Sequence, residues 1–207
     1  MNLFMVCPRL DPRQLTALPK GYSFRTIRPH ELPLWEAFHF DDPQETEEQC
    51  GYMRAFYRDV YAPREELFFR RCTFVCDAQD MPVGTAFLWE VFDPPFTTLH
   101  WLKVKQSHEG QGIGRALISH LLRELPETRY PVYLHTQPES ARAIKLYADF
   151  GFQLITDPKV GHRTNDLEEG FRMLRAAMPA DALHQLRFTP APAAFLLAAQ
   201  RHPGNPF

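Results

Sequence analysis

Three glycines at alternate positions, Gly110, Gly112 and Gly114, stand between a predicted strand and a predicted helix. Glycine lets the backbone adopt unusual dihedral angles and approach a ligand closely. A helix that begins at such a turn presents unpaired N–H groups and the positive end of its dipole. The pattern therefore predicts a cradle for a phosphate or pyrophosphate, to which Arg115 would add a charge-assisted contact.

The glycine run alone does not establish a ligand site. A G-x-G-x-G turn also occurs in strand-to-helix connections that bind no ligand. A dinucleotide-binding loop needs G-x-G-x-x-G near the start of a strand–helix–strand unit, and the spacing here differs. A Walker A loop is excluded because no G-K-[S/T] follows. The elements around the turn must therefore decide between a plain connection and a binding loop.

The elements after the turn alternate between helix and strand. Residues 112–125 carry an apolar stripe with helical spacing. Residues 131–136 are predicted to form a strand and residues 140–150 a second helix. Residues 152–156 and 170–176 are predicted to be two closing strands.

The elements before the turn comprise a strand, two helices and a run of three strands, of which the first two form a hairpin. The predicted helices cover 31–40 and 43–61, and the predicted strands cover 22–28, 67–76, 83–92 and 97–104. A hairpin group followed by a strand–helix–strand–helix unit indicates an α+β fold with a mixed sheet.

Three segments differ in character along the chain. Residues 1–20 hold three prolines and no clear periodicity, so we expect an irregular arm. Residues 21–178 contain the predicted domain. Residues 179–207 form a Pro/Ala-rich extension in which a short helix is expected around 193–200.

Composition narrows the class of protein. The hydrophobic fraction of 44% suffices for a core, and the net charge of −2 argues against a broad nucleic-acid-binding face. No apolar run reaches the roughly 18 residues of a membrane span, and we find no secretory signal. The four cysteines include no CxxC pair, which indicates reduced thiols in a cytoplasmic protein and no metal site.

Two motifs together resemble the GNAT N-acetyltransferase superfamily. The first is similar to its V-x-P-x-x-R-G-x-G-I-G-x-x-L pattern, with Gln106 at the usual proline and Glu109 at the position that opens the loop. Its matching positions are Val104, Gly110, Gly112, Ile113, Gly114 and Leu117. The second is the A-x-x-L/F-Y helix followed by Gly-Phe, carried by Ala143, Leu146, Tyr147, Gly151 and Phe152. The resemblance is firm from about residue 97 to 152 and does not extend past about residue 178.

The resemblance implies a mixed, mostly antiparallel sheet flanked by helices, with a splayed strand at the cofactor site. It also implies acetyl-CoA as co-substrate and no metal. The implied cofactor-binding residues are Leu102, Val104, Glu109, Gly110, Gln111, Gly112, Ile113, Gly114, Arg115, Ser140 and Tyr147. Glu109 is the position at which a carboxylate would stand beside a pyrophosphate.

The implied reaction is direct attack of an amine on the thioester carbonyl, which a backbone N–H near Val104 would polarise. Tyr147 matches the family's general acid, because a neutral phenol with a pKa of about 10 can protonate a departing thiolate. Candidates for the base are His100 first, Glu90 second and His135 third, with ordered water as the alternative. The period-two pattern of the strand places His100 on one face with Leu102 and Val104.

The expected acceptor is the primary amine of a small molecule or a peptide N-terminus. The aromatic residues of the N-terminal helices are expected to be mainly core, with a few lining an acceptor pocket. Two further possibilities stay open: a non-catalytic acyl-CoA-binding sensor or interaction domain, and an enzyme for a longer acyl-CoA. The sequence leaves a homodimer open and predicts neither a nucleic-acid nor a membrane partner.

Overall fold

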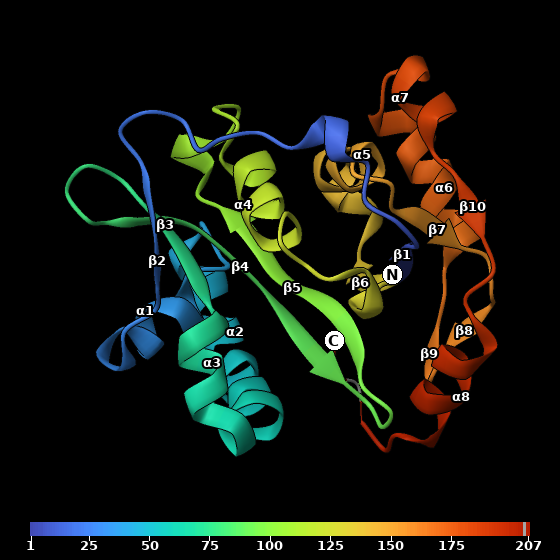
Figure 1. Ribbon diagram of the computed structural model, residues 1–207, viewed down its shortest axis with the longest axis horizontal. Coiled ribbons are helices and arrows are strands. Elements are labelled where there is room, and N and C mark those ends of the chain that lie inside the picture. Colours follow the sequence, from blue (N-terminus) through green and yellow to red (C-terminus); the bar gives the residue numbers. More distant parts are fainter. Residues whose placement is uncertain (205) are drawn as a thin grey trace. The chain divides into compact units, whose positions relative to one another are not determined.

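The computed structural model describes residues 1–204 and 206–207, which form two compact units. Unit 1 consists of Met1–Leu15, Trp89–Leu99 and Leu122–Phe207, and unit 2 of Thr16–Leu88 and His100–Leu121. The strands β4 (Pro82–Val91) and β5 (Phe96–Val104) contribute residues to both units. Figure 1 labels the helices and strands of both units.

Unit 2 combines antiparallel strands with four helices. β2 (Ser23–Thr26) pairs with β3 (Thr73–Cys76), and β3 pairs with β4. The helices are α1 (Leu32–Ala37), α2 (Pro43–Phe56), α3 (Glu65–Arg71) and α4 (Ile113–Leu122), and a π-helical segment, Tyr57–Tyr61, continues α2. Asp42 caps α2 by accepting hydrogen bonds from the amides of Gln44 and Glu45. The predicted hairpin and the three predicted helices of this region are confirmed.

One strand of unit 2 is shorter than predicted. The predicted strand 67–76 is wrong for residues 67–71, which belong to helix α3, and right for residues 73–76. Acidic residues occupy the first turn of α3, and Arg70 and Arg71 occupy its last turn, so both ends complement the helix dipole. These end charges favour a helix over the β-propensity of the two phenylalanines between them.

Aromatic side chains fill the core of unit 2. The fully buried ring of Trp35 lies 5.1 Å from that of Phe68 and 6.3 Å from that of Phe87, measured between centroids. Tyr61 stacks on Phe68 at 5.1 Å. Such pairs add directional attraction to apolar burial. The prediction that the aromatic residues of the N-terminal helices are mainly core is confirmed, with the exposed Tyr52 as an exception.

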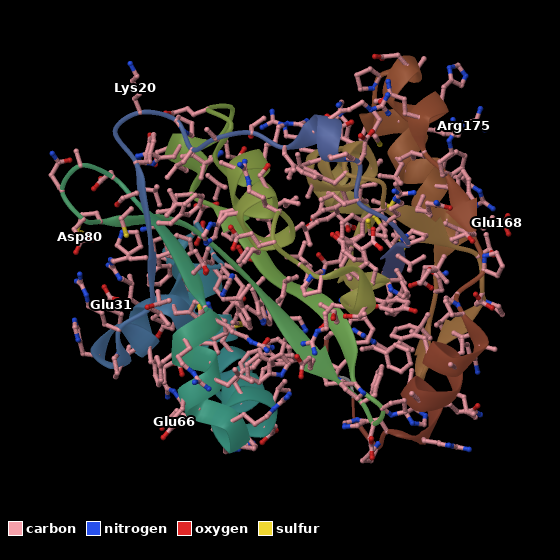
Figure 2. The ribbon with its side chains drawn as sticks, in the orientation of Figure 1. Lys20, Glu31, Glu66, Asp80, Glu168 and Arg175 are labelled. Atoms are coloured by element: carbon pink, nitrogen blue, oxygen red, sulfur yellow. The ribbon has the colours of Figure 1, made fainter. Side chains whose placement is uncertain are left out.

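A charge cluster joins the start of unit 2 to the β3–β4 turn. Arg25 of β2 donates to both carboxylate oxygens of Glu31, at 2.7 and 2.8 Å, and to Asp80 Oδ1 at 2.8 Å. Arg28 donates to Asp80 Oδ2 at 2.9 Å, and its backbone amide donates to Glu31. Figure 2 shows Glu31 and Asp80 on the same edge of this unit. Hydrogen bonds from Arg25 hold the pKa of the buried Glu31 below its usual range.

This cluster gives a pH-dependent contribution to stability. Because the folded pKa of Glu31 is lowered, its contribution is present above the unfolded pKa of about 4.3 and is lost as pH falls through the folded pKa. We expect Glu31→Gln to lower the free energy of unfolding by about 1 to 2 kcal/mol at pH 7, and by much less below pH 4. Thermal unfolding between pH 3 and pH 7 measures this. Glu66→Gln, at an exposed position, is the control, and an equal effect of both variants at pH 7 contradicts the prediction.

Unit 1 is built around a strand formed by the first residues of the chain. β1 (Leu3–Cys7) pairs antiparallel with both β6 (Val132–Thr136) and β7 (Gln153–Ile155), and all five of its residues are buried. The prediction of an irregular arm is wrong for these residues. A strand covered on both faces shows no alternation of polar and apolar residues, so its period-two signature is missing from the sequence.

The closing strand predicted at residues 170–176 is also wrong, because this segment lies within helix α6 (Leu167–Ala177). Leu167, Phe171, Leu174 and Met178 recur at helical spacing, and acidic residues occupy the first turn. β7 pairs with β1 on one side, and residues 170–176 do not pair with it. The strand predicted at residues 152–156 is confirmed as β7.

Unit 1 also contains two further strand pairings, three helices and a short hairpin. β10 (Phe188–Thr189) pairs parallel with β7, and β5 pairs parallel with β6 at Thr97 and Thr98. The other elements are α5 (Ala141–Asp149), α7 (Ala180–Gln185), α8 (Ala193–Arg201) and the short hairpin β8 (Lys159–Val160) and β9 (Arg163–Thr164). The helix expected in the C-terminal extension is α8, whose Phe195 stacks on Tyr133 of β6 at 3.7 Å.

The strands are mixed and mostly antiparallel, with helices flanking them, which confirms the predicted α+β class. Splaying of β5 at its C-terminal end stays a prediction, because that end belongs to unit 2 whereas β6 belongs to unit 1. Among the helices of the described residues, none combines the length and apolar character needed to cross a membrane.

Candidate functional site

The predicted cradle is the connection from β5 to α4, within unit 2. β5 stays bonded to β4 until Lys105, whose amide donates to Val83 O at 2.9 Å. A single 3₁₀ turn, Gln106–His108, follows. Gly110 and Gly112 then adopt positive φ angles of 75° and 84°, and α4 begins at Ile113. These two glycines occupy the left-handed region, in which other residues are strained.

The cradle has donors and open space in the same place. The first intrahelical bond of α4 runs from the amide of Ala116 to Gly112 O at 2.9 Å, so the amides before it have no acceptor within the helix. A Cβ placed on Gly110 would meet no atom within 4 Å, and one on Gly112 would meet only Pro19 Cγ at 3.9 Å. A phosphate or pyrophosphate therefore fits both the polarity and the room of this turn.

The position that departs from the family proline has a structural reason. The amide of Gln106 donates to Asp41 Oδ1 at 3.3 Å, and the other oxygen of Asp41 forms an ion pair with Lys103. A proline at residue 106 would have no N–H for this bond. Asp41 thus fastens the α1–α2 connection to the beginning of the cradle.

The other departure, Glu109, is exposed, and its amide donates to Gln106 O at 3.2 Å. Beside it, Gln111 is held by Tyr22, whose hydroxyl donates to Gln111 Oε1 at 2.8 Å. Gly114 and Arg115 are half-buried in the first turn of α4. The predicted cradle residues from Glu109 to Arg115 thus form one continuous turn in unit 2.

Helix α4 lies unusually close to β4. A Cβ on Gly84 would stand 3.2 Å from Ile113 Cγ2 and 3.2 Å from Leu117 Cδ1. Ile113 and Leu117 are buried here, so the first turn of α4 is fixed to the sheet by its apolar side. The amides of this first turn are held in place by this packing.

His100, the first-ranked base, takes part in a buried hydrogen-bond chain. Trp101 Nε1 donates to the hydroxyl of Tyr61 at 2.8 Å, and this hydroxyl lies 2.5 Å from His100 Nδ1. Burial raises the pKa of Tyr61 above its ordinary range, so its proton is retained. The hydroxyl accepts from Trp101 and still has one proton, which it can donate to His100 Nδ1 when the imidazole carries its own proton on Nε2.

This chain also corrects the predicted faces of β5. His100 and Trp101 are consecutive, yet both side chains reach the same hydroxyl, which residues of a regular strand cannot do. Trp101 has a left-handed φ of 52°, so the strand bulges there. The prediction that His100 shares a face with Leu102 and Val104 is wrong, because the alternation shifts by one residue at Trp101.

Removing the hydroxyl of Tyr61 should be costly. Tyr61→Phe removes the hydroxyl that is the partner of the buried His100 Nδ1 and the acceptor for the indole of Trp101, so we expect a loss of about 2 kcal/mol in unfolding free energy. Tyr57→Phe is the matched control, because the Tyr57 hydroxyl donates to the exposed Glu65 at 2.8 Å, where water can replace it. Denaturant unfolding measures both. Equal losses in the two variants contradict the prediction.

The second motif lies in unit 1, on α5. Tyr147 is buried on this helix, and its carbonyl accepts from the amides of Phe150 and Phe152 at 3.0 and 3.1 Å. Burial raises the pKa of Tyr147 above its ordinary value. Ser140 precedes the helix, and its amide donates to Gln137 O at 3.0 Å. Gly151 ends the helix with a φ of 100°, which confirms its predicted role as the cap.

The other two candidate bases also lie in unit 1, and each has a partner. Glu90 forms an ion pair with Arg129. His135 Nε2 lies 2.9 Å from Asn2 Oδ1, and burial lowers the pKa of this imidazole to about 3. The structure thus places His100 in one unit and Glu90 and His135 in the other.

Sequence reasoning missed the roles of three residues that organise these sites. Tyr61 fixes His100, Asp41 fastens the start of the cradle, and Tyr22 holds Gln111. Tyr61 and Tyr22 have no local signal, since their partners are distant in the chain. For Asp41 a signal existed. Gln106 stands at the family's proline position, so the chain has a backbone N–H there that needs an acceptor.

Comparison with known proteins identifies the family to which the chain is similar. The model of the acetyltransferase (GNAT) family matches residues 31–152, which is more than half of the chain. No curated protein sequence matches the chain.

Two solved structures illustrate the similarity of fold. A GNAT-family acetyltransferase from Colwellia psychrerythraea is 15% identical over 74% of this chain and 52% of its own, with a TM-score of 0.50. A tandem GNAT protein from the clavulanic acid biosynthesis pathway is 21% identical over 73% of this chain and 49% of its own, also with a TM-score of 0.50. The chain thus spans about half the length of these structures. Its matched region includes the cradle and Tyr147, and the chain belongs to the acetyltransferase (GNAT) family.

Proposed function

We propose that the protein is an N-acetyltransferase that transfers the acetyl group of acetyl-CoA to a primary amine, either of a small molecule or of a peptide N-terminus. The observation that carries the proposal is the cradle, in which two left-handed glycines and the first amides of α4, which have no acceptor within the helix, surround open space. Family membership supports the acyl-transfer class. The identity of the acceptor as a primary amine and that of the acyl group as acetyl are both parts of the proposal.

In this proposal, the cradle amides from Gly110 to Arg115 hold the pyrophosphate of the co-substrate. The backbone of Leu102 and Val104 lines the path to the acetyl group, and Ser140 contributes a further contact. Acetyl-CoA, when bound, supplies an acetyl group activated as a thioester. An amide near Val104 polarises the thioester carbonyl and so favours attack by a neutral amine. We propose no metal in this reaction.

We propose Tyr147 as the general acid for the departing thiolate. Its burial supports this role, because the raised pKa keeps the phenol protonated at neutral pH. Tyr147→Phe should lower kcat at least about tenfold, since a thiolate can leave unprotonated but does so more slowly. The Kd for acetyl-CoA, measured by calorimetry on the same preparation, should change less than about twofold. A variant with normal turnover shows that the acid lies elsewhere.

For removal of the ammonium proton we propose ordered water. His100, Glu90 and His135 each have a partner, and His100 Nδ1 lies 2.5 Å from the hydroxyl of Tyr61. If His100 is nevertheless the base, His100→Gln abolishes the rise of kcat/KM with pH near neutrality. If water suffices, that variant keeps the shape of the pH profile.

The proposed function is tested by binding and turnover together. Thermal shift with acetyl-CoA, CoA and longer acyl-CoAs measures binding, and thiol release over a panel of primary amines and peptides measures transfer. Stabilisation by acetyl-CoA together with turnover of at least one amine supports the enzyme. Tight binding with no turnover of any amine favours the alternative, a non-catalytic acyl-CoA sensor. If no CoA thioester shifts the melting temperature, both functions are excluded.

A further inference from the structure

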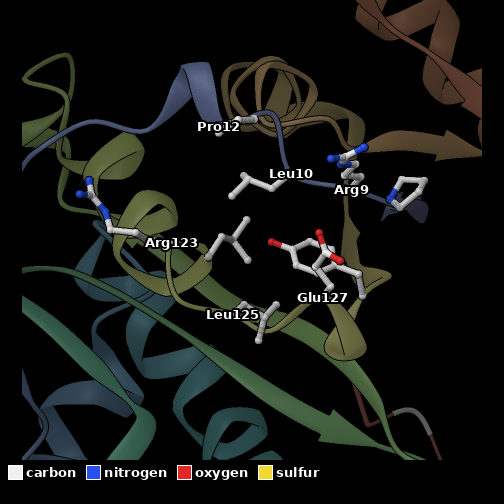
Figure 3. A pocket seen from close by; sticks show the side chains of 9 residues that line it. Arg9, Leu10, Pro12, Arg123, Leu125 and Glu127 are labelled. Atoms are coloured by element: carbon white, nitrogen blue, oxygen red, sulfur yellow. The ribbon is translucent and has the colours of Figure 1, made fainter.

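Unit 1 contains a cavity that no part of the proposed reaction uses. It has a volume of about 560 Å³, within the usual range for small-molecule sites. Its walls come from the segment that follows β1 and from the turn that follows α4. Figure 3 shows Leu10 and Leu125 between Arg9 and Arg123, which lie on opposite sides, with Glu127 beside them.

One polar group of this cavity, the hydroxyl of Tyr130, is not satisfied by the protein. The buried hydroxyl of Tyr130, which lines the cavity, has no hydrogen-bond partner among the described residues. Burial raises the pKa of Tyr130 to about 12, so the hydroxyl keeps its proton. An unpaired buried hydroxyl is unfavourable, and an acceptor on a ligand would relieve that cost.

Two opposite charges line the same cavity without pairing. Neither the guanidinium of Arg9 nor the carboxylate of Glu127 has an ion-pair partner within the part of the chain that the structure describes. The apolar wall includes Leu10 and Leu122. A ligand that is only an anion would meet Glu127, and one that is only a cation would meet Arg9 and Arg123. A zwitterion with an apolar side chain matches all three kinds of group.

We propose that this cavity binds a free apolar α-amino acid. Its carboxylate is bound by Arg9 and by the hydroxyl of Tyr130, its ammonium by Glu127, and its side chain by the leucines. The proposal does not depend on acetyl transfer, and the occupant is distinguished from an acceptor amine by where it binds.

Amide-resolved NMR titration of the full chain, without acetyl-CoA, tests the proposal with three probes that share a phenylethyl group. L-Phenylalanine carries both charges, 3-phenylpropanoate lacks the ammonium and 2-phenylethylamine lacks the carboxylate. We expect L-phenylalanine to bind with a Kd on the order of 1 mM and to shift the amides of Leu10, Leu122 and Tyr130. The two singly charged probes should bind at least about fivefold more weakly.

Two variants make the test independent of folding problems. Tyr130→Phe removes an unpaired hydroxyl, so thermal stability should stay unchanged or rise. The same variant should raise the Kd for L-phenylalanine about fivefold. Glu127→Gln, at an exposed position, should bring L-phenylalanine to the affinity of 3-phenylpropanoate. Acetyl-CoA binding should stay unchanged in both. The proposal is overturned if no probe binds, if the three probes bind equally, if the variants change nothing, or if the shifts fall on Gly110 to Arg115.

Discussion

Replacing Gly112 by Asp is expected to raise the Kd for acetyl-CoA at least about 100-fold, or about 2.7 kcal/mol of binding free energy. Gly112 has a φ of 84° and immediately precedes the first turn of α4. A side chain there would enter the open space of the cradle, and a carboxylate would both repel a pyrophosphate and compete for the helix amides. Calorimetric titration with acetyl-CoA measures the change.

Gly112→Asn separates charge from backbone strain. Asn has the same shape as Asp and tolerates left-handed dihedral angles about equally well, but it carries no charge. We expect Gly112→Asn to raise the Kd for acetyl-CoA about tenfold through bulk and strain, and Gly112→Asp to raise it much more. If the two variants bind equally well, charge repulsion plays no part in the cradle. If Gly112→Asp binds normally, the pyrophosphate does not bind at this turn.

Gly151→Ala is expected to lower the free energy of unfolding by about 3 kcal/mol. The φ of Gly151 is 100°, and a Cβ there would stand 2.7 Å from the carbonyl oxygen of Arg9. That oxygen belongs to the backbone of the segment after β1, which also bonds to the end of α5 through Asp11 N and Phe150 O at 3.1 Å. The clash therefore cannot be relieved by rotating a side chain. Denaturant unfolding followed by circular dichroism measures the loss.

Gly21→Ala is the matched control for this prediction. Gly21 also has a left-handed φ, 89°, but a Cβ there would meet no atom within 4 Å. It should cost about 1 kcal/mol, the strain of the dihedral angle alone. The difference between the two variants measures the contact with Arg9. Similar losses would mean that the chain after β1 moves aside freely.

Local features of the chain made the cradle predictable. Gly110, Gly112 and Gly151 stand where the backbone needs positive φ, and glycine is the residue that permits it. Helix α4 shows a clear apolar stripe because one of its sides packs against β4. These requirements act within a few residues and are therefore visible in sequence.

Features that depend on distant partners were not predictable. Trp101 takes a left-handed conformation that its residue type disfavours, and it is held there in part by Tyr61, forty residues earlier. The resulting shift of faces moved His100 away from the side of Leu102. Likewise, the apolar stripe of α6 resembled a strand over 170–176, because the helical and strand periodicities cannot be distinguished over short runs. Whether Tyr147 acts with the cradle stays a prediction.

The position of β1 has a consequence for how the protein is made. β1 leaves the ribosome long before its partners β6 and β7, because Leu3 pairs with Thr136 and Met5 with Leu154. During synthesis the five apolar residues of β1 therefore stay unpaired until these strands have been made. Pairings so distant in sequence form slowly, and an unpaired apolar strand is prone to association. The strands of unit 1 thus pair with β1 only after β6 and β7 have been translated, whereas β2, β3 and β4 of unit 2 can pair earlier.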